Sequence, residues 1–275
     1  MSREVTVALV CALAAGAGIA MDRGDEDSRA VAPAPPEAQA GAFAGGPDPR
    51  GAGDGGADRP DAAPRASGER GRAPRGTTEA AHVRRGATVR LRDRPGGRTL
   101  EVLDDRTPFG SRATFAVVRR EGGWLGVLSN VLGNGDVGWI RDDPAALAVE
   151  RHSVRIVVDR SDRRLHLLRR GRRALSVPVG IGRPGSETPL GEFAVTDRLG
   201  NGRWSSSYGC CIIALTGRQT RLPAGWQGGD RLAIHGTDGR AAAATSSAGC
   251  VAVDGVPLRR LMRSVPLGTR VTIRG

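Results

Sequence analysis

The chain has 275 residues and a net charge of +12, and all of its basic residues are arginines. Aromatic residues make up 3% of the sequence, so any core must be built mainly from Val, Leu, Ile and Ala. The absence of lysine beside abundant Ala, Gly and Arg indicates a compositional bias rather than a nucleic-acid surface. Because the sequence has no zinc-finger spacing, aromatic platform or basic helix leading into heptads, we expect no nucleic-acid partner.

The first 21 residues have the pattern of an export signal. An apolar run extends from Val5 to Met21 and is followed by a charge-rich stretch. A membrane span needs about 20 apolar residues, and this run is slightly shorter. Small residues at Gly18 and Ala20 suit a cleavage site. We therefore expect residues 1–21 to be a signal peptide or, as the alternative, an N-terminal membrane anchor.

Residues 22–80 have the composition of a linker. They are rich in Ala, Pro, Gly, Asp and Arg, and Phe43 is their single aromatic residue. Such a segment cannot bury enough apolar surface to offset the entropy lost on ordering the chain. We expect a disordered tether that gives an exported domain reach.

Residues 83–143 have the pattern of a small all-β module. Residues 87–92 alternate apolar and polar side chains, as a half-buried strand does, and 94–97 form a turn. Further strands are expected at 99–103, 112–118, 123–128 and 137–140, and residues 142–144 close the module. Several short strands at this spacing predict a small barrel.

The order of these elements, with glycine before both Trp124 and Trp139, resembles a bacterial SH3-like domain. The resemblance implies a module that binds cell-wall peptides or packs on a catalytic domain. The two tryptophans are either ligand platforms or core residues. We favour the core, because large aromatic side chains are highly buried on average.

Residues 151–275 form a second β-rich stretch. Strands are expected at 154–158, 164–168, 174–180, 192–196, 211–215, 232–235 and 269–273. One helix is expected after Asp254, which is a favourable N-cap residue. Helical spacing relates Val256, Leu258, Leu261, Met262 and Val265, and residues 266–268 end the helix.

Two short segments carry the chemistry. One is Ile234-His235-Gly236-Thr237, and the other is Ser246-Ser247-Ala248-Gly249-Cys250-Val251. Cysteine is a good nucleophile only as the thiolate, and a nearby imidazole is the usual means of forming one. The pattern predicts a covalent, acyl-transferring enzyme with Cys250 as nucleophile and His235 as its base. We expect no metal and no cofactor, because the Cys and His spacings supply no cluster of four ligands. The other histidines, His82, His152 and His166, have no motif and are expected to be structural.

These segments, with Val179-Gly180-Ile181-Gly182 and Thr188-Pro189-Leu190-Gly191-Glu192-Phe193 before them, resemble the YkuD-type catalytic domain of L,D-transpeptidases. The resemblance implies a β-rich sandwich or barrel with one short helix after the cysteine. Members attack the carbonyl of the third residue of a peptidoglycan tetrapeptide stem, release D-Ala and transfer the acyl group to an amine. It also implies an extracytoplasmic location in the bacterial cell envelope and peptidoglycan stem peptides as partners. We expect a monomer.

The resemblance also assigns the supporting residues. The backbone of Ala248, Gly249 and Cys250 stands where the family forms its oxyanion hole. Gly236 lets the chain turn tightly beside the base, and Ser247 shapes the nucleophile loop. Tyr208 either lines the substrate pocket or has only a packing role.

Two positions depart from the family pattern. Ala248 replaces a common histidine, and Ala252 replaces a common arginine that supports the site. The second change leaves rate and substrate preference open, with Arg259 or Arg260 as spatial substitutes. We expect carbapenems to acylate Cys250.

Adjacent Cys210 and Cys211 are interpreted as two thiols that point in opposite directions on a strand. The alternative is a disulfide to Cys250, which would silence the enzyme.

Three functions remain: an L,D-transpeptidase, an L,D-carboxypeptidase or hydrolase of the same fold, and a non-catalytic protein that binds the cell wall.

Overall fold

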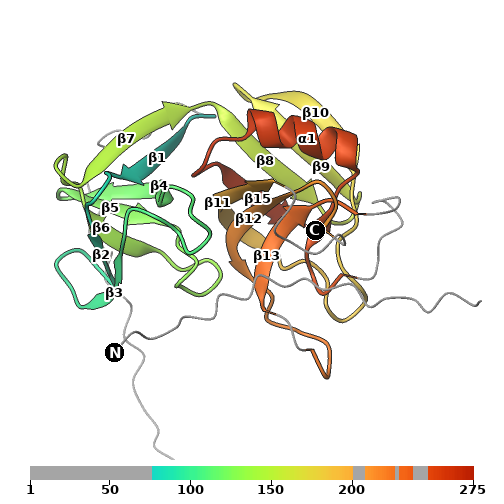
Figure 1. The fold of residues 1–275 in the computed structure, drawn as a ribbon, viewed down its shortest axis with the longest axis horizontal. Coiled ribbons are helices and arrows are strands. Elements are labelled where there is room, and N and C mark those ends of the chain that lie inside the picture. Colours follow the sequence, from blue (N-terminus) through green and yellow to red (C-terminus); the bar gives the residue numbers. More distant parts are fainter. Residues whose placement is uncertain (1–75, 201–207, 227–228, 238–246) are drawn as a thin grey trace, which may run out of the picture. The chain divides into compact units, whose positions relative to one another are not determined.

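A computed structural model describes residues 76–200, 208–226, 229–237 and 247–275. The described residues form two β-sheets and one helix, which confirms a mainly β fold (Figure 1). No helix in these ranges has the length and apolar character needed to cross a membrane. The expected signal segment 1–21 and the expected linker up to residue 75 lie outside the described residues.

The N-terminal sheet has seven strands in the order β3-β2-β6-β5-β4-β1-β7. A two-residue loop of Gly122 and Gly123 joins β4 to β5, and both glycines have positive φ, as a tight hairpin turn of this kind requires. The strands are β1 (Thr78–Val83), β2 (Val89–Arg92), β3 (Thr99–Leu103), β4 (Thr114–Glu121), β5 (Trp124–Val127), β6 (Gly138–Arg141) and β7 (Leu147–His152).

This sheet is larger than expected at both ends. Strand β1 starts at Thr78, inside the range expected to be linker, and β7 ends at His152, beyond the expected boundary at residue 143. The two strands pair antiparallel from Thr78 with His152 to Val83 with Leu147. Strand β1 also pairs with β4 and is buried throughout. Small alanines give β1 a weak strand signal, so its conformation depends on pairing with two neighbours.

The two tryptophans have different surroundings. Trp139 is buried, as expected. Trp124 is only half-buried, and the guanidinium groups of Arg92 and Arg141 lie 5.8 and 5.5 Å from the centre of its ring. Trp139 is therefore a core residue, whereas the Trp124 ring makes cation–π contacts with two arginines.

The C-terminal sheet has eight strands in the order β10-β9-β8-β15-β11-β12-β13-β14. Its neighbours are antiparallel except for two parallel pairs, β8 with β15 and β13 with β14. The elements are β8 (Val154–Asp159), β9 (Arg164–Arg169), β10 (Arg172–Pro178), β11 (Gly191–Gly200), β12 (Cys211–Arg218), β13 (Arg231–His235), β14 (Val251–Ala252), α1 (Gly255–Ser264) and β15 (Arg270–Arg274). Every strand expected from the sequence is present.

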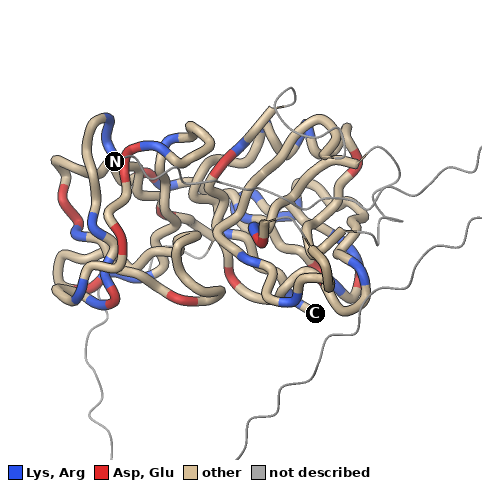
Figure 2. The backbone as a smooth tube through the Cα atoms, turned by 60° about the horizontal axis from the view of Figure 1, so that its bottom comes forward, with Lys and Arg blue, Asp and Glu red and all other residues tan. Residues whose placement is uncertain are grey.

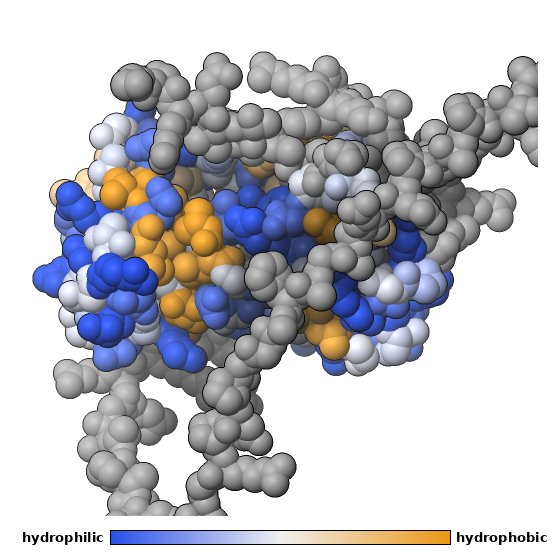
Figure 3. Space-filling view, turned by 90° about the horizontal axis from the view of Figure 1, so that it is seen from below, coloured by the Kyte–Doolittle hydropathy of each residue, from blue (hydrophilic) through white to orange (hydrophobic). Residues whose placement is uncertain are grey.

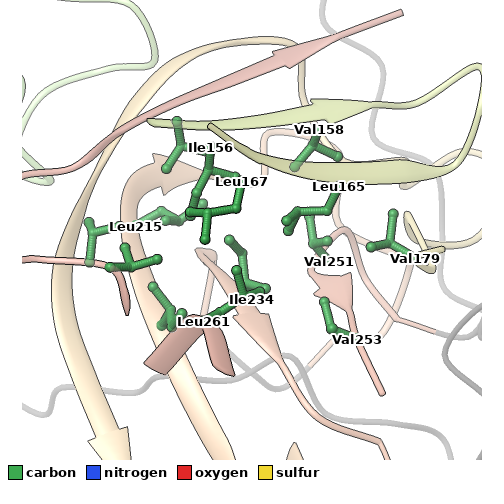
Figure 4. Close-up of a cluster of buried hydrophobic side chains, with 14 of the residues drawn as sticks. Ile156, Val158, Leu165, Leu167, Val179, Leu215, Ile234, Val251, Val253 and Leu261 are labelled. Atoms are coloured by element: carbon green, nitrogen blue, oxygen red, sulfur yellow. The ribbon is translucent and has the colours of Figure 1, made fainter. Parts of the chain in front are cut away.

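Alternate residues of these strands meet in one core (Figure 4). Ile156 and Val158 of β8 point to the same face, as residues two apart on a strand do. Val251 of β14 and Val253, directly after this strand, are buried in the same cluster. Each such side chain contributes about 1.5–3 kcal/mol relative to an exposed position. The core therefore anchors the chain next to Cys250.

Helix α1 covers this core with Leu258 and Leu261. Val256 is 72% exposed, so its expected place on the buried face is wrong. At 3.6 residues per turn, Val256 lies about 160° around the helix from Leu258. Asp254 occupies the N-cap position, as expected, although its side chain makes no capping hydrogen bond. Its carbonyl oxygen accepts the first helical hydrogen bond, from the Leu258 amide, at 3.0 Å.

Basic and acidic residues are interspersed along the described backbone (Figure 2). The most buried acidic side chain of the N-terminal sheet is Glu79 of β1, which pairs with Arg120 at 2.8 Å and Arg151 at 2.6 Å. Burial raises the pKa of Glu79, but the hydrogen bonds from the two arginines outweigh burial and lower it overall. Part of the arginine excess therefore stabilises this sheet.

Candidate active site

Strand pairing brings the two chemical segments together. Strand β13 ends at His235, and β14 begins directly after Cys250. Their parallel register places Ile234 beside Val251 and His235 beside Ala252. Extending the register by one residue places Cys250 beside Ala233, and these two residues share a buried cluster. Residues two apart on a strand share a face, so His235 and Cys250 lie on the same face of the sheet.

His235 is completely buried, and its two ring nitrogens have different roles. Nδ1 lies 2.6 Å from the carbonyl oxygen of Gly236. A carbonyl only accepts, so Nδ1 carries the proton and Nε2 has the lone pair. Nε2 is buried and has no hydrogen-bond partner among the described residues. The arrangement leaves one nitrogen able to accept a proton.

The environment of His235 keeps its ring neutral. Burial lowers the pKa of His235 below its ordinary value, and the hydrogen bond to Gly236 opposes burial only in part. A neutral imidazole is the form that a general base requires near neutral pH.

Cys250 is also completely buried. Its sulfur lies 3.8 Å from the carbonyl oxygen of Arg231. Nε2 of His235 has no hydrogen-bond partner among the described residues, so it is not hydrogen-bonded to this sulfur. None of the three described cysteines is a free thiol, so nucleophilic attack requires a reduced Cys250. Catalytic hydrogen bonds often tighten only when substrate binds.

The nucleophile loop is held by close backbone packing. Gly249 has φ +110°, and a β-carbon at this position would overlap Nε2 of Gln219. A β-carbon at Gly182 would lie 2.9 Å from Cα of Gly249. The hydroxyl of Ser247 donates to the carbonyl of Cys250 at 2.9 Å and closes the loop. Ala248, between them, is buried.

Gln219 is a supporting residue that the sequence did not single out. Its Nε2 donates to the carbonyls of Ser186 and Glu187, both at 3.1 Å, and its Oε1 accepts from the Arg221 amide. The side chain is buried against Gly249 and ties the 186–187 loop to the nucleophile loop. No motif marks it, since a lone glutamine has no sequence signature.

The base has its own support. The ring of Tyr208 meets His235 edge-on, with centroids 5.1 Å apart and an interplanar angle of 88°, so it packs against the base. Gly236 lies against Gly209, and a β-carbon on Gly236 would lie 2.8 Å from the carbonyl oxygen of Tyr208. Its φ is not positive, so Gly236 permits this close approach rather than the tight turn expected.

Cys210 and Cys211 are bonded to each other. The interpretation as two opposed thiols is therefore wrong. Strand alternation applies only within a ladder, and β12 begins at Cys211, so Cys210 is not held to the opposite face. The carbonyl of Cys211 accepts a hydrogen bond from the Gly236 amide at 3.3 Å. The disulfide is thus joined to the segment that follows His235.

The expected substitutes for the missing arginine lie elsewhere. Arg260 points to strand β10 and donates to the carbonyl of Ala174 at 3.4 Å. Arg259 packs near Gly255 on the exposed side of α1. Ala252, at the position of that arginine, is buried beside His235. The backbone of Arg231, four positions before His235 on β13, lies near the nucleophile, with its carbonyl oxygen 3.8 Å from the Cys250 sulfur.

Arg231 forms a buried ion pair. Its guanidinium lies 3.9 Å from the carboxylate of Asp197 and donates to Thr196 at 2.6 Å. Burial lowers the pKa of Arg231 to about 10, although Asp197 raises it, so the side chain stays charged at neutral pH. The hydroxyl of Thr107, from the loop after β3, donates to Asp197. The two sheets are therefore linked beside the nucleophile.

The other histidines lie outside this site. His82 of β1 contacts Thr114 at 2.9 Å and Glu150 at 3.2 Å. Within the described ranges, no group of three or more His, Cys, Asp or Glu side chains is arranged to hold a metal ion.

Comparison with known proteins finds a family match for the C-terminal part of the chain. Residues 153–273 match the model of the YkuD family, described as the L,D-transpeptidase catalytic domain. This segment is a YkuD-type L,D-transpeptidase catalytic domain. It contains His235, Cys250 and the loops that hold them. Comparison with curated proteins finds no match.

Solved structures show likeness at low identity. Bd1075 of Bdellovibrio bacteriovorus is 23% identical, with 45% of this chain and 48% of that chain covered and a TM-score of 0.36. An L,D-transpeptidase of Stackebrandtia nassauensis is 20% identical, with 44% of this chain and 55% of that chain covered and a TM-score of 0.34. L,D-transpeptidase 3 of Mycobacterium tuberculosis is 17% identical, with 50% of this chain and 74% of that chain covered and a TM-score of 0.36. The chain spans about half the length of the first two structures.

Proposed function

We propose that this chain is an exported L,D-transpeptidase that remodels peptidoglycan through a cysteine acyl-enzyme. The observation that carries the proposal is the buried pair formed by His235 and Cys250 on one sheet face, within a segment that matches the family model. Export, the cell-envelope location, the monomeric state and the SH3-like nature of the N-terminal sheet belong to the same proposal.

The proposed first half-reaction forms a thioester. Nε2 of His235 takes the proton of the Cys250 thiol, and the thiolate attacks the carbonyl of the third stem residue. The bond to the terminal D-Ala breaks, and the imidazolium returns the proton to the departing amine. Backbone amides of the Ala248–Cys250 loop stabilise the negative charge on the carbonyl oxygen. Their rigidity comes from Gly249 and Gln219.

The second half-reaction transfers the acyl group. An amine on a neighbouring stem attacks the thioester, the carbon–sulfur bond breaks, and a new amide bond forms. Nε2 of His235 accepts the proton of the attacking amine and passes it to the Cys250 sulfur. Water in place of the amine gives a trimmed stem, which is the hydrolase alternative.

One incubation distinguishes the candidate functions. The full chain, kept reduced, is mixed with a disaccharide-tetrapeptide that ends in D-Ala and compared with Cys250→Ala. We expect mass spectrometry to show a cross-linked dimer that lacks one D-Ala, absent from the control. A D-Ala-trimmed monomer favours the hydrolase. Unchanged substrate from a folded, reduced sample favours a non-catalytic wall-binding protein.

A further inference from the structure

The positive charge of the chain is concentrated in its C-terminal part. Residues 153–275 contain 20 arginines and 8 acidic residues, whereas residues 76–152 contain 12 arginines and 10 acidic residues. A compositional bias acts on the whole chain and does not account for this difference. The excess of positive charge therefore belongs to the sheet and helix that hold the active site.

The hairpin of β9 and β10 carries a dense group of exposed arginines. Arg169 pairs with Arg172 across the ladder, and Arg173 follows on β10. The two-residue turn between the strands consists of Arg170 with φ +51° and Gly171 with φ +75°. Turns with two positive φ values favour Asn, Asp or Gly at the first position, because a larger side chain is strained there. An arginine therefore occupies this position against the preference of the backbone.

Helix α1 presents a second group of arginines. Arg259, Arg260 and Arg263 are exposed, and at 3.6 residues per turn they lie within about 100° of the helix circumference. Leu258 and Leu261, which cover the core, lie on the opposite side of the helix. The helix contains no acidic residue. Its solvent-facing side is therefore uniformly basic.

The two groups form one surface. The guanidinium of Arg260 donates to the carbonyl oxygen of Ala174 at 3.4 Å. Ala174 directly follows Arg173 on β10, so this bond places the helix arginines beside the hairpin arginines, as α1 and β10 lie in Figure 1. The arginine surface consists of seven residues: Arg169, Arg170, Arg172, Arg173, Arg259, Arg260 and Arg263.

The charge of the arginine surface is not neutralised within the described part of the chain. Other arginines pair with acids, as Arg120 does with Glu79 and Arg274 with Asp159. None of the seven makes an ion pair with a described residue. Clustered like charges repel one another and oppose the compact state. Charges on an edge strand such as β10 also discourage pairing between sheets, but that role requires no arginine on α1. The surface therefore has the character of a site for an anionic partner.

The apolar residues argue against a lipid bilayer as that partner. A helix that lies on a bilayer buries its apolar face among the lipids. In α1 this face is already buried in the protein, since Leu258 and Leu261 are both 0% exposed. Among the large apolar side chains of α1, all of them described, Val256 alone is exposed. In the view of Figure 3, apolar side chains gather instead over the N-terminal half.

We propose that the arginine surface binds a linear phosphodiester polymer of the cell envelope and so holds the catalytic domain on it. A phosphodiester carries its charge in the polymer backbone and offers two oxygens to the guanidinium fork. Neighbouring side chains lie about 5–6 Å apart on one helix face and about 5 Å apart across a ladder. Successive phosphates of one polymer chain therefore meet several arginines.

Polymer bound at this surface leaves the active site open. Helix α1 packs on the sheet face that carries Ile234 and Val251. His235 and Cys250 belong to the opposite face, because each is one residue away from these two along its strand. The polymer is neither the donor nor the acceptor of the proposed reaction. The envelope location rests on the proposed function, but binding is measured without turnover.

A charge reversal on the hairpin tests the surface. Fluorescent poly(glycerol phosphate) is titrated against the full, reduced chain and followed by fluorescence anisotropy. For Arg172→Glu with Arg173→Glu, we expect the Kd at low salt to rise about tenfold or more and to depend less on salt, since phosphate contacts are lost. The matched control is Arg85→Glu with Arg90→Glu, because these arginines are also exposed, make no ion pair with a described residue and give the same net charge. Its Kd should stay within about twofold of the parent value, because distant exposed charges are screened.

A second variant changes the helix and leaves the hairpin intact. Arg259→Glu with Arg263→Glu should raise the Kd by a similar factor, with circular dichroism and urea unfolding to show that each variant is folded. Equal Kd values in the surface variants and the Arg85/Arg90 control overturn the arginine surface as the binding site. A parent chain that does not bind the polymer at low salt overturns the whole inference.

A second probe distinguishes the polymer from a membrane. Vesicles of phosphatidylglycerol and phosphatidylcholine present phosphodiesters on a bilayer, and we expect them to bind more weakly than the polymer at equal phosphate concentration. Tighter binding to the vesicles overturns the polymer as the partner.

Carbapenem acylation separates this inference from the proposed function. The rate of acylation of Cys250 should be unchanged in both surface variants, because the arginine surface lies on the other side of the sheet. Slower acylation in a folded surface variant contradicts that separation. A parent chain that binds the polymer but does not react with carbapenem supports this inference and counts against the proposed function alone.

Discussion

At the scale of single residues, the protonation state of His235 decides whether the dyad can work. The carbonyl of Gly236 holds the proton on Nδ1, and burial keeps the ring neutral. The free lone pair on Nε2 is therefore present over the whole range in which the ring stays neutral. Burial of a base has a cost, since protonating it inside the protein is unfavourable.

The pH dependence of acylation follows from this. We expect the rate of carbapenem acylation of Cys250 to fall on the acid side only below about pH 6.5, the ordinary pKa of histidine. The pKa of His235 is lowered, so the neutral form survives to lower pH than in an exposed histidine. Stopped-flow measurement of the acylation rate from pH 4.5 to 8 shows this decrease at acid pH. The variant His235→Gln should lose both the pH-dependent decrease and most of the acylation rate. An acid limb centred above pH 6.5 contradicts the assignment.

The buried ion pair gives a second residue-scale prediction. Asp197→Asn leaves the buried guanidinium of Arg231 without its counter-charge, and we expect a loss of about 3 kcal/mol or more in the free energy of unfolding. The control is Asp230→Asn, because Asp230 pairs with Arg218 at a more exposed position. That pair should be worth about 1 kcal/mol or less. Urea unfolding measures both, and equal losses would show that the Asp197 pair is not effectively buried.

At the scale of elements, glycine positions determine how the loops around the dyad meet. The loops at residues 182–187 and 247–250 approach each other closely enough that backbone occupies the space of side chains. The sequence showed these glycines in motifs but not what each one contacts. Gln219, which fills the remaining space beside Gly249, had no motif and required the folded structure.

Adding one methyl group tests this packing. Gly249→Ala forces a clash with Gln219 at a position with φ +110°, and we expect acylation of Cys250 to slow about a hundredfold, as when an oxyanion donor is misplaced. The control, Gly185→Ala, also has positive φ, at +84°, but its β-carbon meets nothing within 4 Å. It should cost only about 1–2 kcal/mol of stability. The measurement is the acylation rate of Cys250 in folded samples of both variants. Equal rates would show that the packing of the nucleophile loop does not affect acylation.

At the scale of the whole molecule, burial of histidines couples stability to pH. All four histidines have a lowered pKa, with burial as the largest cause, and they lie in both sheets at His82, His152, His166 and His235. A base whose pKa is lower in the folded state binds fewer protons there than in the unfolded chain. Stability is then complete above the unfolded pKa and declines as pH falls.

We therefore expect the free energy of unfolding to decrease as pH falls below about 6.5. The window is distinct from that of Glu79, whose lowered pKa contributes stability that is lost only below its ordinary value of 4.5. Urea unfolding at pH 7.5, 6.5 and 5.5 measures the contribution of the histidines to the free energy of unfolding. The variant His166→Gln should show a smaller change of this free energy with pH. Constant stability across these three values would contradict the burial of neutral histidines.

The sequence by itself determined the mainly β class, the positions of most strands, the helix after the cysteine, and the two segments that hold His235 and Cys250. These follow from local patterns: alternation along strands, turn glycines and motif spacing. It misplaced Val256 and left the start of β1, residues 78–80, in the linker, because those features depend on what packs nearby. Only the tertiary structure decided the tautomer of His235, the bond between Cys210 and Cys211, the Arg231–Asp197 pair and the contact of Arg260 with β10. Each depends on contacts between residues far apart in the chain or on the direction of a side chain, and the local pattern specifies neither.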